Sequence, residues 1–64
     1  MSNWTRVDSS MGENLELPAN ASMRLIKSRL SITGKRCILE SQGGAIRTYR
    51  MVGTTYTFTV TECY

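Results

Sequence analysis

The feature that most constrains the fold is the last extended stretch of the chain, where large apolar residues and threonines alternate over Tyr56–Thr61. Strict alternation places one set of side chains on each face of a strand, and threonine, valine and aromatic residues suit a pleated surface. Turn-forming residues recur at regular intervals ahead of it, at Gly34-Lys35, Gln42–Gly44 and Gly53–Thr55. This rhythm is typical of consecutive antiparallel strands joined by short turns.

The chain has 64 residues, of which 41% are apolar, so we expect one small domain over residues 1–64 with a limited core. We predict an all-β fold, a small curled antiparallel meander or barrel of about five strands. Residues 1–22 are expected to be the least regular part, with Trp4–Val7 and Asn14–Leu17 adding edge strands or covering the open face. Trp4 is the expected plug of the core. The expected core consists of Leu30, Ile32, Cys37, Leu39, Tyr49, Met51, Tyr56, Phe58 and Val60.

Residues 21–33 are open to two interpretations. They are rich in helix formers, with Asn20 or Ser22 as a possible cap. A helix here would carry two opposed apolar stripes, which a one-sided core cannot bury. The stripes are Met23, Ile26 and Leu30 on one side, and Ala21, Leu25 and Ile32 on the other. We therefore favour a strand, and the alternative is an α+β fold with one helix at 21–31 packed on a three-stranded antiparallel sheet.

The strand interpretation predicts its own pairing. A two-residue turn at Gly34-Lys35 would set Ile32 opposite Cys37, Leu30 opposite Leu39 and Arg29 opposite Glu40. The later turns predict further pairs, because a one-residue slip would turn each apolar set outward. These pairs are Cys37 with Tyr49, Met51 with Phe58, Tyr49 with Val60, and Arg47 with Glu62.

The absence of histidine excludes several function classes. Without it there is no Ser-His-Asp or Cys-His catalysis and no imidazole metal site. Two cysteines are too few for a four-thiolate zinc site. We therefore predict that the protein is not an enzyme and has no catalytic, cofactor-binding or metal-binding residues.

Location is also read from the sequence. The chain has no apolar run long enough to span a membrane, and its first 20 residues lack the basic and apolar regions of a signal peptide. We expect a cytoplasmic protein with no membrane partner. In a reducing compartment Cys37 and Cys63 are expected to be free thiols rather than a disulfide.

Charge is concentrated in the middle of the chain, although the net charge is only +3. Residues 24–50 hold seven Lys and Arg residues against Glu40 alone. Such a concentration favours a non-enzymatic binding protein whose basic β surface neutralises the phosphates of nucleic acid or of another phosphate-rich partner. The predicted contacts are Arg24, Lys27, Arg29, Lys35, Arg36 and Arg50.

Two other functions fit a chain this small. The first is an inhibitor or adaptor, of the kind that bacteriophages encode, which binds and occludes a host protein. The second is a minor structural or assembly subunit, which would form homo-oligomers through the 56–63 strand if that strand lies at the edge of the sheet.

Overall fold

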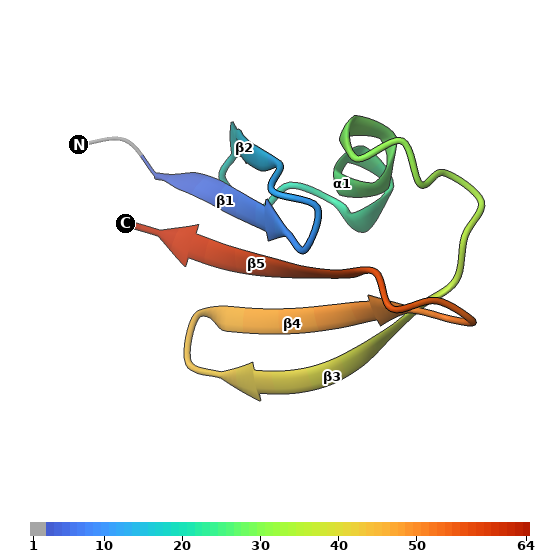
Figure 1. Ribbon diagram of the computed structural model, residues 1–64. Coiled ribbons are helices and arrows are strands. Elements are labelled where there is room, and N and C mark those ends of the chain that lie inside the picture. Colours follow the sequence, from blue (N-terminus) through green and yellow to red (C-terminus); the bar gives the residue numbers. More distant parts are fainter. Residues whose placement is uncertain (1–2) are drawn as a thin grey trace.

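The computed structural model describes residues 3–64 and consists of one antiparallel sheet with a short helix on one face (Figure 1). Its elements in chain order are β1 (Trp4–Ser9), β2 (Asn14–Pro18), α1 (Met23–Arg29), β3 (Cys37–Gly43), β4 (Ile46–Met51) and β5 (Thr57–Cys63). The five strands follow the order β2-β1-β5-β4-β3. The mostly β fold and the number of strands agree with the expectation, but the sheet is open and does not close into a barrel.

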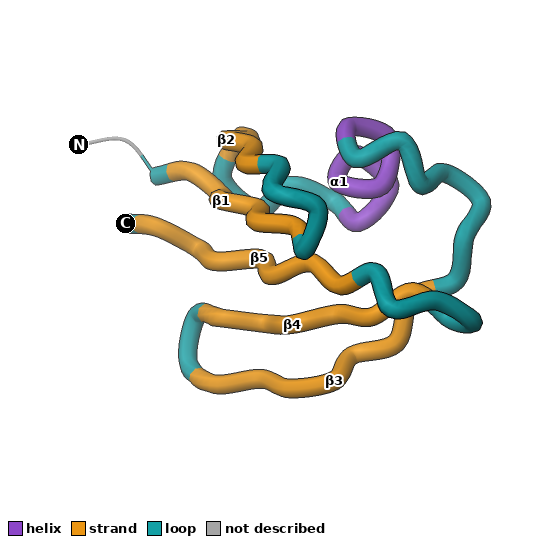
Figure 2. The backbone as a smooth tube through the Cα atoms, in the orientation of Figure 1, coloured by secondary structure: helices purple, strands orange, loops and turns teal. Residues whose placement is uncertain are grey.

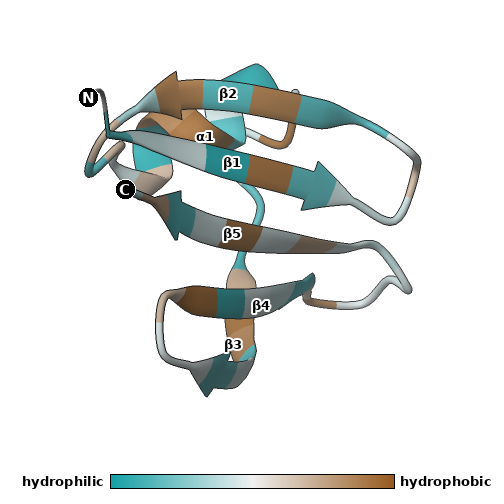
Figure 3. Ribbon diagram, turned by 90° about the vertical axis from the view of Figure 1, so that its left-hand side faces the viewer, coloured by the Kyte–Doolittle hydropathy of each residue, from teal (hydrophilic) through white to brown (hydrophobic). Residues whose placement is uncertain are grey.

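The connection between β2 and β3 crosses one face of the sheet. These two strands are the opposite edges, so residues 19–36 must pass from one side of the sheet to the other, and Figure 2 shows this connection as loop, helix and loop. Figure 3 shows α1 behind β1 and β2, whereas the β3–β4 hairpin extends beyond the helix. The face that carries α1 is therefore covered at the β1–β2 side and open at the β3–β4 side.

The core lies between this connection and the sheet. Buried side chains come from β1, β2, α1 and its following loop, β4 and β5, and they are Val7, Leu17, Ile26, Leu30, Ile32, Met51, Phe58 and Val60. Tyr49 stacks on Phe58, with ring centroids 5.3 Å apart. Such a pair stabilises the fold by about 0.5–1.5 kcal/mol beyond the contribution of the apolar area that it buries.

Part of the expected core is wrong. Leu39 is 50% exposed, because β3 lies beyond the reach of the helix. Val7, Leu17 and Ile26 are buried without having been expected. Trp4 is only half-buried and does not plug the core, since the alternation of β1 turns Thr5 and Val7 toward the helix instead.

Residues 26–33 were interpreted as a strand, but residues 26–29 are the second half of helix α1. The predicted hairpin at Gly34-Lys35 is therefore wrong. Ser22 is the N-cap, and its hydroxyl accepts a hydrogen bond of 3.2 Å from the backbone N–H of Leu25. The helix ends at Arg29, and Ser31 adopts a left-handed conformation with φ of 60°. Ile32 is therefore outside the helix, and burying it does not require a second apolar helix face.

The strand registers differ from those predicted by two residues. Tyr49 lies opposite Leu39 instead of Cys37, and it lies opposite Phe58 instead of Val60. Beyond the irregularity between Leu39 and Ser41 the β3–β4 register moves by one further residue. Elsewhere a shift by an even number keeps each side chain on its expected face, since side chains alternate with a period of two. For the same reason Arg47 and Glu62, predicted to be directly opposite, are diagonal neighbours, and their side chains still form an ion pair of 3.3 Å.

Strand β5 is central in the sheet. It pairs with β1 on one side and β4 on the other, so its backbone has no free edge, and the condition for homo-oligomers through the 56–63 strand is not met. Residues 1–22 were expected to be the least regular part, yet β1 and β2 occupy most of their described portion.

Candidate functional site

The charged side chains divide into two groups according to the element that carries them. Each of the three arginines on strands pairs with a carboxylate: Arg6 with Asp8, Arg47 with Glu62 and Arg50 with Glu40. The other five cations form no ion pair within residues 3–64, and all lie on α1 or on the loop that follows it. They are Arg24, Lys27, Arg29, Lys35 and Arg36. We refer to residues 24–36 as the basic segment.

The basic segment has no acidic neighbours in sequence, because no Asp or Glu occurs between Glu16 and Glu40. Four of its cations are exposed and Lys27 is half-buried. The Lys27 ammonium donates a hydrogen bond of 2.6 Å to the backbone carbonyl of Lys35. This bond ties the loop to the helix and brings the two lysine positions together, although they are eight residues apart in sequence.

Local sequence explains why the cations of α1 are favourably placed. Lys27 and Arg29 lie in its last turn, where positive side chains interact favourably with the helix dipole and the free carbonyls. Ile26 is turned toward the sheet and is buried. Burial of this one side anchors the helix, and Arg24 and Arg29 are exposed to solvent.

Five of the six predicted contacts are therefore in the basic segment, and the sixth is elsewhere. Arg50 lies on β4 opposite Thr57, on the face of the sheet that α1 does not cover, and it pairs with Glu40. The five cations were expected on a β surface. They lie instead on the connection that covers the sheet. Lys27 and Arg29 lie in the segment interpreted as a strand and instead belong to the helix.

The uncovered face of the sheet has a different character. Three threonines of β5, at every second position, lie on this face, and Thr48 of β4 lies beside them. The Thr48 and Thr59 hydroxyls are 3.4 Å apart. Its arginines, Arg6 and Arg50, are both paired with carboxylates. Positive charge is thus balanced on this face and unbalanced along the basic segment.

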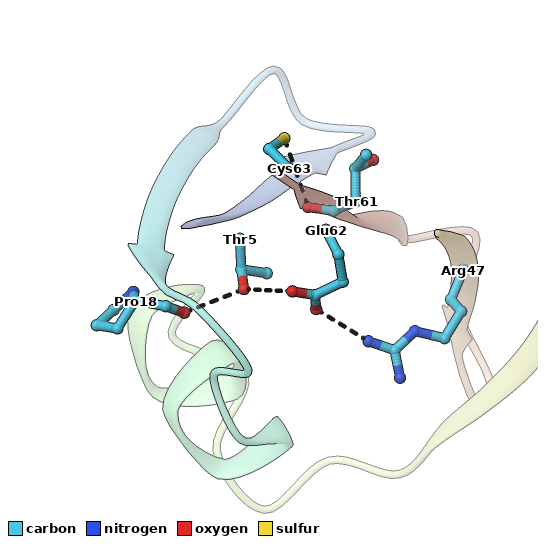
Figure 4. A network of polar contacts seen from close by, with 6 residues as sticks. All are labelled: Thr5, Pro18, Arg47, Thr61, Glu62 and Cys63. Carbon is cyan, nitrogen blue, oxygen red and sulfur yellow. Dashed lines mark hydrogen bonds and ion pairs between the residues drawn. The ribbon is translucent and has the colours of Figure 1, made fainter. Parts of the chain in front are cut away.

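The face of the sheet that carries α1 also holds a polar cluster that was not predicted from the sequence (Figure 4). The hydroxyl of Thr5, which is fully buried, lies 3.0 Å from the carbonyl oxygen of Pro18 and 3.0 Å from the carboxylate of Glu62. Its single proton can be donated to one of them at a time. Glu62 also pairs with Arg47. The cluster joins β2, β1, β5 and β4 and satisfies its own charges, so its role is structural. The sequence signal that could have indicated a buried Thr5 is the alternation of β1, which puts Thr5 on the same face as Val7.

Groups that could support other chemistry are sparse. Cys37 and Cys63 are both free thiols, as expected. Among residues 3–64, no three His, Cys, Asp or Glu side chains are grouped so that they could hold a metal ion. A depression on the surface at the β1–β2 hairpin is lined by Arg6, Asn14, Leu15 and Glu16. In the described part of the chain, no helix is long and apolar enough to cross a membrane.

Comparisons with known proteins add nothing to this geometry. No protein-family model matches the chain, and no curated protein or solved structure matches it at a significant level. Any functional assignment must therefore come from the residues themselves.

Proposed function

We propose that the protein is a small, non-enzymatic, cytoplasmic binding protein that engages the phosphates of nucleic acid through its basic segment. The observation that carries this proposal is the division of the charges. The strand arginines pair with carboxylates, whereas Arg24, Lys27, Arg29, Lys35 and Arg36 form no ion pair in the described chain. Unpaired cations gathered on one connection attract a polyanion, because phosphate binding releases condensed counterions.

The size of the basic segment bears on how such binding would work. Helix α1 has seven residues and is about 10 Å long at 1.5 Å per residue. Four of the segment's five cations are exposed, and the aromatic residues Tyr49 and Phe58 are committed to the core. Contacts from this segment would therefore go to the phosphate backbone and would depend little on base sequence.

The proposed contacts set an upper limit on the salt dependence. If all five cations contact phosphates, the logarithm of the binding constant falls against the logarithm of salt with a slope of about −4.5 for duplex DNA and about −3.5 for a single strand. Each contact that is removed reduces the slope by about 0.9 for a duplex. These values are large enough to measure with fluorescently labelled oligonucleotides.

The test compares three variants that each remove one positive charge. Arg29→Gln and Lys35→Gln change the basic segment, and Arg6→Gln is the matched control, because Arg6 is a similarly exposed cation that already pairs with Asp8. We expect Arg29→Gln and Lys35→Gln to weaken binding to any sequence and to flatten its salt dependence, whereas Arg6→Gln leaves the slope unchanged.

Equal effects of all three variants would show that net charge alone matters and would reject the basic segment as the site. Absence of binding at physiological salt would reject nucleic acid as the partner. A protein target that is occluded by this chain would then be sought. Its signature is a strong loss at one or two central residues with little dependence on salt.

A further inference from the structure

The two edge strands of the sheet differ in how well they are protected against pairing with another strand. Strand β2 has five residues and includes Pro18 and the exposed Glu16, which are features that discourage edge pairing. Strand β3 has seven residues, no proline and a single charge, Glu40. It is the less protected edge.

Exposed apolar side chains gather next to β3, and they lie on both faces of the sheet. Leu39 is 50% exposed on the face that carries α1, and Ile38 is 39% exposed on the opposite face. Ile46, 49% exposed, lies on the neighbouring strand, where its partner across the ladder is Gly43. A partner resting on one face would cover only some of these side chains, whereas an added strand covers both faces of the edge.

Backbone groups of β3 are available for such a strand. The Val52 N–H donates to the Arg36 carbonyl over 3.0 Å. Hydrogen-bonded pairs alternate along an antiparallel ladder, so Ile38 directs its N–H and carbonyl toward Arg50 on β4. Cys37 and Leu39 therefore direct theirs away from β4, toward the open edge.

We infer that β3 is a self-association edge, and that two copies of this chain pair through it, antiparallel, around a two-fold axis at Ile38. In this register Ile38 meets its own counterpart, and Cys37 lies opposite Leu39 of the other copy. The outward backbone groups of these two residues then form four hydrogen bonds across the interface. The two sheets become one sheet of ten strands.

Charge complementarity favours a second copy in this register over an unrelated strand. Arg36, which forms no ion pair within the described chain, comes to lie opposite Glu40 of the other copy, and symmetry makes this contact twice. The irregularity of β3 lies between Leu39 and Ser41, so the regular backbone ahead of it supplies all the hydrogen bonds. An axis at Leu39 would instead place Ile38 opposite Glu40 and would require pairing through the irregularity.

Self-association through β3 is independent of the proposed function. Arg36 is the one residue that both proposals use, so the tests of each rest on other positions. A two-fold axis perpendicular to the sheet keeps both α1 helices on the same face, each at the far end of its own sheet. The dimer would therefore present two basic segments on one side.

The experiment has two readouts. Sedimentation equilibrium of the reduced protein should show the mass rising with concentration from 7.2 kDa toward twice that value. Ile38→Lys should raise the dissociation constant about tenfold or more, because it places like charges at the axis. Met11→Lys is the matched control, since Met11 is an exposed apolar residue outside the strands, and it should leave the constant unchanged. A mass that stays at 7.2 kDa at all concentrations would overturn the inference.

Cross-linking tests the register. In a background with Cys37→Ser and Cys63→Ser, Ile38→Cys places two thiols at the axis, where directly opposite Cα atoms about 4.5–5.5 Å apart suit a disulfide. Ile46→Cys is the control, because it is similarly exposed but one strand away. We expect Ile38→Cys to oxidise to a dimer about tenfold faster than Ile46→Cys. Equal rates would show that β3 does not pair in this way.

Discussion

Replacing Ser22 with alanine tests the helix that the sequence pattern did not favour. The Ser22 hydroxyl accepts the Leu25 N–H at 3.2 Å, and its backbone is extended, with φ of −71° and ψ of 157°. Loss of such a cap costs about 1 kcal/mol, within a range of about 0.5–2 kcal/mol. For a domain of this size, 1 kcal/mol lowers the melting temperature by about 4–8 °C.

The matched control is the same chemical change six residues further on, at Ser28. This side chain is exposed within α1, and alanine is the better helix former, so Ser28→Ala should be neutral or should stabilise the protein by up to about 0.5 kcal/mol. The two substitutions are thus expected to have opposite signs. If residues 26–33 formed a strand, Ser22→Ala would be neutral and Ser28→Ala would be slightly destabilising.

The assay is urea unfolding, followed by the fluorescence of Trp4, the single tryptophan, and by far-ultraviolet circular dichroism. Equal m-values for the variants would show that the free energies of unfolding can be compared directly. A Ser22→Ala protein as stable as the wild type, together with a less stable Ser28→Ala protein, would refute the cap and the helix that it begins.

Two further predictions concern polar groups. Burial raises the pKa of the Tyr56 hydroxyl above its ordinary value of 10.0, and its hydrogen bond to the Glu13 carboxylate, 3.1 Å long, acts in the same direction. The folded state therefore holds this proton more tightly, so the stabilisation is complete below about pH 10 and is lost as the pH rises through the folded pKa. Tyr56→Phe should flatten the alkaline fall in stability and Tyr64→Phe should not; identical curves would contradict this. Thr5→Val should cost about 1–3 kcal/mol in urea unfolding, because it removes the hydrogen bond that the buried Thr5 hydroxyl donates to the Glu62 carboxylate or the Pro18 carbonyl, whereas Thr61→Val on the face that α1 does not cover should change stability by less than about 0.5 kcal/mol.

The strands were predictable because their signal is local. Alternation along Tyr56–Thr61 and the spacing of the turns are properties of neighbouring residues, and both correspond to β5 and to the β3–β4 hairpin. The exact register was not predictable, because it depends on how many residues each turn takes. The β3–β4 turn leaves two residues, Gly44 and Ala45, outside the ladder, where three had been expected.

The helix, which the sequence offered only as the alternative at 21–31, was not favoured for a different reason. The two opposed stripes exist only if the helix runs from Ala21 to Ile32. In the structure Ala21 precedes the cap, and Ser31 ends the helical path before Ile32. Only Leu25 of the second stripe remains in the helix, and it is half-buried. Helix length is set by capping geometry, and composition alone carries little information on it.

The candidate site was predictable as a set of residues but not as a surface. Excess positive charge in the middle of the chain is visible in the sequence, and five of the six predicted contacts fall in the basic segment. Whether a cation is already paired depends on contacts between residues far apart in the chain. Arg47 and Glu62 are 15 residues apart, and Arg50 meets Glu40 across a hairpin.

The most direct test of the central claim is the salt dependence of binding by the unmodified protein. Its affinity for mixed-sequence duplex and single-stranded oligonucleotides should be measured from low to physiological salt. The proposal predicts binding to every sequence, with a negative slope no steeper than about −4.5 for the duplex and about −3.5 for the single strand. Binding that salt does not weaken, or no binding at all, would contradict the claim that the basic segment of this protein binds phosphates.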